Sequence, residues 1–516
     1  MGKISDFFGK LRDELFGDSK ADVGKKPIDS DAHQIVDSST DPLATSRRDS
    51  SELLRPQREP YFIQIGYDFG TSFSKCVYRE VYKDKAWVFC PGCYNDKEKP
   101  FLIPSAVLFQ NGELARHTDS QIQYPNNGLY HLKFAIEKIA SGDINAPVLN
   151  PYRSALNGMG GLHLAEFVEK CAVFFLGSSL GEIQQDAKSR FPDFGDNPAD
   201  QFAVNLAIPV ADASVPKIQG TYERILKKAW SIAPSLTREA RVKLHHIDEM
   251  LEDASRSIDI CMLDDLCFVY PEVSANVQAF IRSPASSPDP RTIYFFSDTG
   301  AGTVDQSVFT YTKQLNYFSA NVFPIGSSHI ERLACGSNVS TKQLDYWRSK
   351  KETGDGSPNL TQAKNAIENK LSHYSHSQTI KETQRHLPKG NGVAPVPTMK
   401  KHIRIIFGGG GHQDNPYKKG VVGAFSDFFH PEQHQPRITA IQTPGDLELA
   451  VHQQSWISRL YVAYGLSFLK ADLVGNRYPK QTALKQKSTK KDMVMCSCRG
   501  ISPDCPRCSG LGMYRE

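Results

Sequence analysis

The sequence predicts an α/β protein, and three observations lead to this prediction. Strand-like apolar runs alternate with longer segments of helical periodicity from Tyr61 to about Tyr478, without a visible repeat. Of the 516 residues, 40% are hydrophobic and 10% aromatic, which is enough for substantial cores and excludes a wholly disordered protein. The chain is also far longer than a typical domain of roughly 150 residues, so we expect more than one folded unit.

Side-chain periodicity gives the individual elements. Strands are expected where short β-branched and aromatic runs are bounded by turn residues, and helices where apolar residues recur every three or four positions. The predicted strands are residues 61–69, 73–82, 101–109, 202–210, 292–297, 304–311 and 402–407. The predicted helices lie near residues 129–140, 162–176, 217–231, 237–256, 361–372 and 452–471. We interpret residues 376–399 and 412–446, which are rich in polar residues, as surface insertions.

The region before the first strand divides into two parts. Residues 1–16 place Ile4, Phe7 and Leu11 on one face, which predicts an amphipathic helix. Residues 17–59 are rich in Asp, Ser, Lys and Pro, and we expect them to form a disordered linker. We expect the helix to dock on its own domain or on a partner protein, and peripheral contact with a membrane is the alternative.

Composition limits the classes of function. Lys and Arg total 61 against 57 Asp and Glu, and a net charge of +4 gives no clear nucleic-acid signal. No apolar run reaches the length of a transmembrane segment, and the first residues lack the apolar core of an export signal. Eleven cysteines form no even disulfide framework, so we expect a reducing, cytoplasmic location.

The first chemical motif is an apolar strand that ends in an acidic turn. It contains Ile63-Gln-Ile-Gly-Tyr-Asp68-Phe-Gly70-Thr71-Ser72, and a second strand begins directly afterwards. Backbone N–H groups and hydroxyls in such a turn can bind phosphate oxygens, and the carboxylate can hold a hydrated Mg²⁺. Glycine is expected where the backbone must approach the ligand closely.

The same chemistry recurs much later in the chain. Asp298-Thr-Gly300-Ala-Gly302-Thr303 stands between two strand-like runs. A single turn of this kind is weak evidence, because Asp-x-Gly turns are common. Two of them are harder to obtain by chance, and two opposed hairpins could bind β- and γ-phosphates from both sides.

A third glycine-bearing strand end follows. Ile403-Arg-Ile-Ile-Phe precedes four consecutive glycines, Gly408, Gly409, Gly410 and Gly411. Such a turn lets the backbone pass flat against a base or a ribose. A plain flexible loop is the alternative, although the apolar strand before it favours a defined turn.

Together these motifs resemble the actin-like ATPase superfamily, and within it the nucleotide-binding domain of DnaK-type (heat-shock 70) chaperones. Asp68-Phe-Gly-Thr-Ser and Asp298-Thr-Gly-Ala-Gly-Thr match the two phosphate hairpins of that family, and Phe407-Gly-Gly-Gly-Gly matches its adenosine turn. Shorter matches occur in the same order at residues 100–105, 208–210, 270–276 and 462–466. The resemblance implies a two-lobed actin-like fold over residues 60–478, with ribonuclease H-like lobes around a nucleotide cleft.

The resemblance also implies catalytic roles. Asp68 and Asp298 would orient the water ligands of Mg²⁺, and Lys133 would neutralise the γ-phosphate. Glu272 would bind a metal-bound water or position the attacking one, although Pro271 precedes it here whereas the family motif has Glu before Pro. A solvated helical lysine is the alternative interpretation of Lys133.

Further residues would bind the nucleotide, ATP or ADP. Gly326 matches the loop beside the adenine, and Lys370 and Ser372 match the helix that covers it, although the Lys-Arg pair of the family is not reproduced. The complete implied set is Gly70, Thr71, Ser72, Gly300, Gly302, Thr303, Gly326, Lys370, Ser372, Gly408, Gly409, Gly410 and Gly411.

The C-terminal region contains a candidate zinc site. After a predicted linker at residues 479–495, residues 496–516 contain four thiols in Cys-x-Cys and Cys-x-x-Cys pairs, a pattern that suits tetrahedral Zn²⁺. The second pair resembles the units of DnaJ-type zinc modules. The predicted ligands are Cys496, Cys498, Cys505 and Cys508. Free or redox-active thiols are the alternative.

The function that the resemblance implies is a nucleotide-dependent switch. We expect the protein to bind ATP, hydrolyse it slowly and thereby control partner proteins that contact the N-terminal helix, the insertions or the zinc module. Only 38 residues follow Tyr478, so we expect no peptide-clamp domain of the chaperone type. The alternatives are a filament-forming actin-like ATPase and a small-molecule kinase of the same superfamily.

Overall fold

The computed structural model describes the greater part of the chain after residue 57. The described residues are 58–91, 99–157, 162–209, 215–236, 241–257, 260–283, 292–311, 314–337, 339–386, 403–413, 415–426, 436–449, 451–477, 493–495 and 513–515. The chain divides into two units, Met1–Gln57 and Arg58–Glu516, and the second contains all of these residues. The predicted N-terminal helix and the four cysteines of the predicted zinc module lie outside the described residues.

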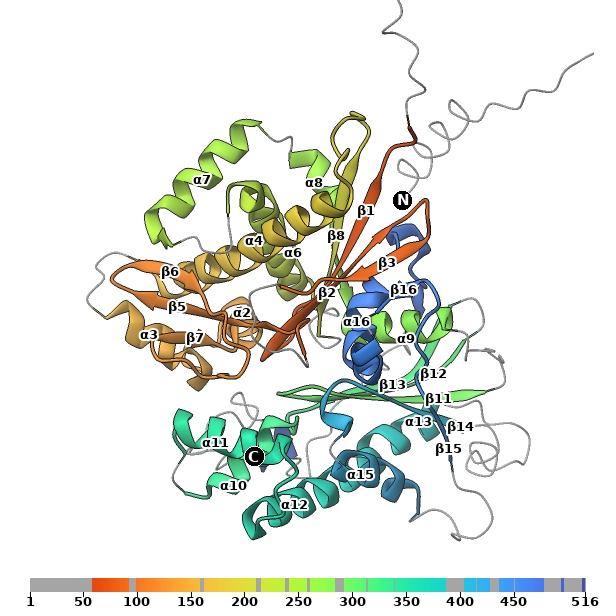
Figure 1. Ribbon diagram of the computed structural model, residues 1–516. Helices are drawn as coiled ribbons and strands as arrows, with labels where there is room; N and C mark the ends of the chain where they lie inside the picture. Colours follow the sequence, from red (N-terminus) through yellow and green to blue (C-terminus); the bar gives the residue numbers. More distant parts are fainter. Residues whose placement is uncertain are drawn as a thin grey trace, which may run out of the picture. The chain divides into compact units, whose positions relative to one another are not determined.

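The described part is a mixed α/β structure, as predicted (Figure 1). This unit begins at Arg58, within the segment that the sequence predicts as a linker. The Arg58 guanidinium donates to the Asp200 carboxylate over 2.8 Å and forms an ion pair with Asp193 at 2.7 Å. These contacts fix the chain directly before its first strand.

The first large sheet has the strand order β10-β8-β1-β2-β3-β16 among the described residues, and β4 adds to β2. Neighbours β1, β2 and β3 are antiparallel, whereas β8 is parallel to β1 and β10 is parallel to β8. The strands are β1 (Phe62–Asp68), β2 (Phe73–Glu80), β3 (Lys85–Val88), β4 (Ile103–Pro104), β8 (Gln201–Ile208), β10 (Cys267–Pro271) and β16 (Leu447–Glu448).

The second large sheet repeats this arrangement. Its order is β15-β14-β11-β12-β13-β17; β11, β12 and β13 are antiparallel, and β14 and β15 continue in parallel from β11. The strands are β11 (Ile293–Thr299), β12 (Val304–Tyr311), β13 (Leu315–Phe323), β14 (Ile403–Gly408), β15 (Arg437–Thr439) and β17 (Asn476–Arg477). Thus β1 and β11 hold equivalent places, and each of them ends beside an acidic turn.

Two smaller sheets complete the strands of the described residues. One has the order β7-β5-β6-β9, and the other consists of β18 and β19. Their bounds are β5 (Ala106–Gln110), β6 (Glu113–Arg116), β7 (Gly128–Tyr130), β9 (Val242–Lys243), β18 (Met493–Met495) and β19 (Met513–Arg515). Because β18 and β19 pair antiparallel, they bring together the two ends of the cysteine-rich segment.

Helices cover one face of the first sheet. Ile63, Ile65 and Tyr67 alternate along β1 and pack into one core with the long helices α4 and α6 and with α2. The helices on this side are α2 (Leu132–Ser141), η2 (Pro147–Leu149), α3 (Asn150–Leu156), α4 (Leu164–Arg190), α6 (Pro216–Ile232), η3 (Ala233–Ser235), α7 (Leu244–Ser257) and α8 (Ile260–Leu266). The helix predicted to begin at residue 237 begins later, because Val242 pairs with Leu114 in the small sheet.

Two helices, α9 (Glu272–Arg282) and α16 (Ile457–Leu466), lie between the two large sheets (Figure 1). Their side chains share a core with β2 and β3 on one side and with β11 and β12 on the other. The helices contact each other closely, since a Cβ on Gly465 would lie 1.9 Å from the Ala275 carbonyl oxygen. The helix predicted at residues 452–471 is interrupted: η6 (Val451–Trp456) precedes α16 and η7 (Lys470–Asp472) follows it.

The other face of the second sheet is covered by six helical segments. These are α10 (Ser328–Cys335), α11 (Thr341–Glu352), α12 (Pro358–Tyr374), the π-helix η4 (Ser375–Ile380), α13 (Lys381–His386) and α15 (Asn415–Ser426). A short 3₁₀ turn, η5 (Gly411–Gln413), precedes α15. None of the helices in the described ranges combines the length and apolar character that a membrane span requires.

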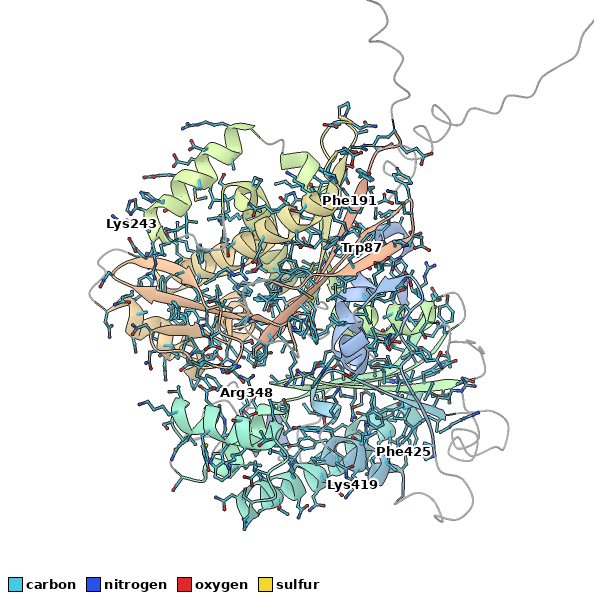
Figure 2. The ribbon with its side chains drawn as sticks, in the orientation of Figure 1. Trp87, Phe191, Lys243, Arg348, Lys419 and Phe425 are labelled. Atoms are coloured by element: carbon cyan, nitrogen blue, oxygen red, sulfur yellow. The ribbon has the colours of Figure 1, made fainter. Side chains whose placement is uncertain are left out.

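The interpretation of residues 376–399 and 412–446 as surface insertions is wrong for residues 376–386 and 415–426, whereas residues 436–446 are mostly exposed or partly exposed. Ile380 and Tyr417 are buried in the core of the second sheet. Phe425, which is labelled in Figure 2, packs edge-on against Phe295, with ring centroids 5.4 Å apart. Gly420 is a packing contact, because a Cβ there would lie 2.8 Å from a backbone oxygen of α12.

Candidate functional site

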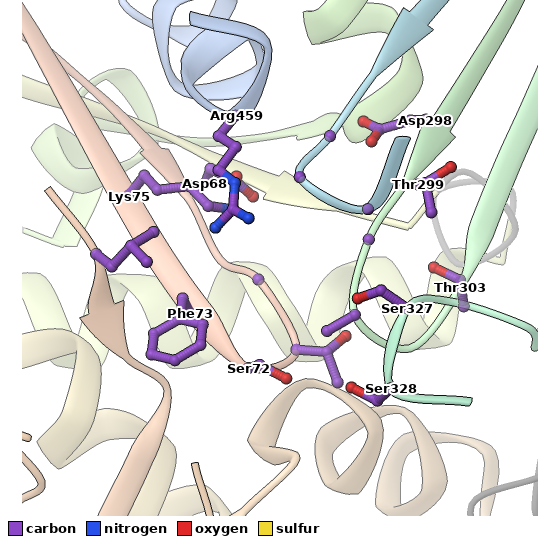
Figure 3. A pocket seen from close by; sticks show the side chains of 18 of the residues that line it. Asp68, Ser72, Phe73, Lys75, Asp298, Thr299, Thr303, Ser327, Ser328 and Arg459 are labelled. Atoms are coloured by element: carbon purple, nitrogen blue, oxygen red, sulfur yellow. The ribbon is translucent and has the colours of Figure 1, made fainter. Parts of the chain in front are cut away.

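A cavity of about 300 Å³ is lined by residues from the carboxyl ends of β1 and β11 (Figure 3). Most of the predicted site residues line this one cavity. They are Asp68, Gly70, Thr71, Ser72, Lys133, Glu272, Asp298, Gly300, Thr303, Gly409, Gly410 and Gly411. The topology explains this convergence, because the parallel strands β1, β8 and β10 end at the same edge of one sheet, as β11 and β14 do in the other.

The first turn holds a buried ion pair. Asp68 is the last residue of β1 and is 2% exposed, and its cross-strand partner Lys75 places Nζ 2.6 Å from Asp68 Oδ2. The other carboxylate oxygen, Oδ1, is buried and accepts no hydrogen bond from the described residues. Burial raises the pKa of Asp68, and the Lys75 ammonium offsets only part of that shift.

The second turn holds a pair of carboxylates. Asp298 and Asp305 are cross-strand partners on β11 and β12. The Asn276 amide on α9 donates to Asp298, and the Thr303 hydroxyl donates to Asp305 over 2.8 Å. Burial, followed by the nearby charges of Glu272 and Asp305, raises the pKa of Asp298 well above its usual value.

The two turns contact each other across the cavity. A Cβ on Gly302 would lie 3.3 Å from Thr71 Cγ2 and 2.9 Å from the Phe134 ring, so only a glycine allows this approach. Gly326 supports the second turn from behind, where its N–H donates to the Gly302 carbonyl over 3.2 Å. Gly302 and Gly326 therefore shape the cavity without being among the residues that line it.

Lys133 lies on the first turn of α2 and is directed at Glu272. Its Nζ is 2.6 Å from Glu272 Oε2, and its side chain is 5% exposed, which excludes a solvated helical lysine. The Tyr222 hydroxyl donates to the Lys133 carbonyl over 2.8 Å and holds the backbone. Burial alone would lower the pKa of Lys133, but Glu272 and Asp68 raise it above its usual value, so the ammonium keeps its charge.

The four glycines form a defined turn beside the second acidic turn. Gly408 is paired in register with Asp298. Gly409 has a φ of 77° and its N–H donates to the Ser458 carbonyl over 3.1 Å. A Cβ at Gly409 would lie 2.2 Å from Asp298 Oδ1, so the turn passes directly over that carboxylate.

Lys370 and Ser372 do not line the cavity, and neither do Gly302, Gly326 and Gly408. Lys370 and Ser372 lie on α12, whose apolar residues face the second sheet. The Lys370 Nζ is 5.8 Å from the centre of the Tyr374 ring on the same helix, and Ser372 faces Gly423 of α15. The resemblance assigned them to a nucleotide site because of one short segment, and packing places that segment elsewhere.

Several lining residues were missed by the sequence analysis. Lys75 and Asp305 follow Asp68 and Asp298 at the same spacing, and a tight hairpin pairs such positions across its strands, so this signal was present in the sequence. Six further missed residues come from α10, α11 and η6–α16, and no local motif marks them. They are Glu331, Arg348, Lys351, Glu352, Trp456 and Arg459.

Helix α11 covers one side of the cavity and contacts the opposite wall. Arg348 donates to the Ser120 carbonyl over 3.1 Å, and Lys99 forms an ion pair with Glu352 at 3.1 Å. Behind these contacts, Lys351 and Glu331 form a buried ion pair at 2.7 Å. The lining is thus rigid and strongly polar on this side.

The donor set fits a divalent cation with a preference for oxygen ligands. Asp68 offers a buried oxygen without a hydrogen bond from the described residues, and Asp298 and Asp305 are adjacent carboxylates. Burial, followed by repulsion from Glu272 and Asp305, raises the pKa of Asp298, and a bound Mg²⁺ would relieve that repulsion. Lys75 and Lys133 stand nearby to bind anionic oxygens.

Comparison with known proteins gives no independent assignment. No family model matches the chain, and a search of the curated proteins finds no match.

Proposed function

We propose that the protein binds ATP together with Mg²⁺ in this cavity and hydrolyses the nucleotide slowly, as a switch that controls partner proteins. One observation carries the proposal. Two acidic glycine turns, at equivalent places in two sheets of the same strand order, contact each other at Thr71 and Gly302. A triphosphate chain is the ligand that such an opposed pair of turns suits best.

The repeated sheet arrangement supports an actin-like architecture for the proposed ATPase. In each sheet, three antiparallel strands are followed by two parallel ones, and the acidic turn joins the first strand to the second. The resemblance of the three glycine motifs to DnaK-type nucleotide-binding domains agrees with this arrangement. The proposal therefore includes two lobes around a nucleotide cleft.

In the proposed reaction the chain's own groups bind and orient the triphosphate. The backbone N–H groups of the two turns and the hydroxyl of Thr71 donate to phosphate oxygens. Lys133 places a permanent positive charge beside the transferred phosphoryl group, and Glu272 orients the attacking water. Mg²⁺, held by Asp68, Asp298 and Asp305, would spread the charge that develops on the phosphate oxygens.

Two further parts of the proposal concern other regions. Pairing of β18 with β19 brings together the ends of the segment that contains the four cysteines, and this supports a zinc site at Cys496, Cys498, Cys505 and Cys508 as a contact for partner proteins. Cys76, Cys171 and Cys267 are buried thiols, which agrees with a reducing cytoplasmic location.

Calorimetry of the full-length chain with ATP and ADP, each with and without Mg²⁺, tests the proposal. We expect saturable binding of both nucleotides, stronger in the presence of Mg²⁺. Slow release of phosphate from ATP in buffer alone would separate hydrolysis from transfer to an acceptor, as in a kinase. Absence of heat with MgATP, measured on a chain whose folding is verified by circular dichroism, would contradict the proposal.

A further inference from the structure

Arg459 reaches the cavity from a different wall than the two acidic turns. It belongs to the first turn of α16, and Figure 3 shows its side chain directed into the cavity beside Asp68. The neighbouring lining residues on this wall are Ser458 and Val462 of the same helix. This position was not marked by any motif in the sequence.

The guanidinium is held on two sides. Its Cζ lies 4.3 Å from the centre of the Trp456 ring, which is a cation–π distance. On the other side it meets Gly410, where a Cβ would be 2.5 Å from Arg459 Nε and 2.7 Å from Cζ. The glycine turn is itself attached to α16, because the Gly409 N–H donates to the Ser458 carbonyl over 3.1 Å. Little side-chain entropy remains to be lost when this arginine binds an anion.

The surroundings of Arg459 indicate which part of a nucleotide it meets. Lys133 and the contact between Thr71 and Gly302 surround the place where the terminal phosphate would lie. Arg459 instead stands against Gly410, in the turn that would pass along the nucleoside, and its side chain is directed toward Asp68. The α- and β-phosphates link the nucleoside to the terminal phosphate, so they would lie between the glycine turn and Lys133.

Charge supports an anion at this point. Lys75, Lys133 and Arg459 line the same cavity, so an anion bound there would lie near all three positive charges. A planar guanidinium can donate two parallel hydrogen bonds to one phosphate, which a lysine cannot do.

We propose that Arg459 is a nucleotide-binding residue that donates to the α- or β-phosphate, the phosphates that ATP and ADP share. This inference rests on the proposed function. It assigns Arg459 to the binding of both nucleotides and not to the transferred phosphoryl group. Since an interaction made equally with ATP and ADP is uniform binding, its removal weakens both complexes by the same factor.

Calorimetric titration of Arg459→Ala with MgATP, MgADP and adenosine tests the assignment. We expect the dissociation constants of MgATP and MgADP to rise by the same factor, roughly 10- to 100-fold, and that of adenosine to stay unchanged. Arg459→Lys retains the charge without the planar fork and should give an intermediate loss for both nucleotides. Arg190→Ala is the matched control, because Arg190 also stacks on a tryptophan, with Cζ 5.2 Å from the Trp87 ring centre, and does not line the cavity.

Each outcome decides a different question. An equal loss for adenosine would show that Arg459 contacts the base and would overturn the assignment, as would wild-type affinity for MgATP in Arg459→Ala. A loss for MgATP alone would place Arg459 at the terminal phosphate and would also overturn it. If Arg459→Ala proves unstable in thermal melting, Arg459→Lys and Arg459→Gln carry the same comparison. If the wild-type chain binds no nucleotide, the proposed function fails and this assignment fails with it.

Discussion

The two large sheets contain the same kind of acidic hairpin, but the residue paired with the aspartate is positively charged in one and negatively charged in the other. In the first half the residue paired across the strands with Asp68 is Lys75, and in the second half the residue paired with Asp298 is Asp305. The spacing, the strand order and the register are otherwise alike. The first half therefore contains an ion pair, and the second contains two adjacent carboxylates.

This difference separates two functions that one scaffold can support. In the first half the Lys75 ammonium opposes the effect of burial on the pKa of Asp68. In the second half the neighbouring carboxylates add to the effect of burial, and the pKa of Asp298 is raised well above its usual value. A proton or a cation would therefore relieve the repulsion in the second hairpin, whereas Lys75 already opposes the effect of burial in the first. We infer that Mg²⁺ would be bound mainly by the second half.

The largest expected effect comes from removing one charge of the carboxylate pair. Asp298→Asn keeps the shape of the side chain but removes a metal-binding oxygen charge, so ATP hydrolysis should fall by at least about 100-fold. Phosphate release at saturating MgATP measures this effect. Asp253→Asn is the control, because the Asp253 side chain is 77% exposed on α7. This variant should hydrolyse ATP like the wild type. Turnover of Asp298→Asn close to the wild-type rate would contradict the assigned site.

The ion pair of the first half should matter for stability. Lys75→Met leaves the buried Asp68 carboxylate without its cation, so the free energy of unfolding should fall by about 2–4 kcal/mol. Urea denaturation in EDTA measures this change, and the double variant with Asp68→Asn should recover most of it. Lys85→Met removes an exposed pair with Glu448, in which both side chains are more than half exposed, and should cost under about 1 kcal/mol. Equal effects of the two lysine variants would contradict the comparison.

The carboxylate pair should also show in the pH dependence of stability. The folded-state pKa of Asp298 is raised above its usual value of 3.8, so its contribution to stability is present at low pH and is lost as the pH rises through the folded-state pKa. Without Mg²⁺, Asp298→Asn should therefore gain stability over the wild type, and the gain should increase from pH 4 toward neutral pH. Urea midpoints in EDTA across this range measure the difference. A stability difference between the variant and the wild type that does not change with pH would show that the pKa of Asp298 is not raised in the folded protein.

The smallest expected effect concerns the contact between the turns. Gly302→Ala places a methyl group 2.9 Å from the Phe134 ring and 3.3 Å from Thr71, so the turns must separate slightly, at a cost of about 1–2 kcal/mol. Gly356→Ala is the matched control, because no atom lies within 4 Å of its Cβ position. Thermal melting of both variants tests the contact. If Gly356→Ala lowered the melting temperature more than Gly302→Ala does, the two turns would not be in close contact at Gly302.

The sequence predicted those parts of the site whose signals are local. The strands before Asp68, Asp298 and Gly408 are apolar runs that end in glycine turns, and each forms where expected. By contrast, Arg459 and Arg348 reach the cavity only because α16 and α11 pack beside it, and such packing leaves no pattern near those residues.

Two errors have a common physical origin. Helix α15 was interpreted as part of a polar surface insertion, although Tyr417, Val421 and Phe425 recur at helical spacing and are buried. Lys370 and Ser372 were assigned to the site by a short similarity that carries no information on packing. In both cases the outcome depends on which face of a helix meets the second sheet, and tertiary contacts decide that.

The helix pair α9 and α16 has a mechanical consequence for the whole molecule. The two helix backbones are in close contact at Gly465 and Ala275. Strand β1 is in similarly close contact with α16, because a Cβ on Gly66 would lie 2.1 Å from the Ala463 carbonyl oxygen. Sliding at such surfaces would force backbone atoms into each other, whereas a small rotation about the long direction of the pair preserves the spacing. Any motion of one large sheet relative to the other would therefore have to keep these backbone contacts in place.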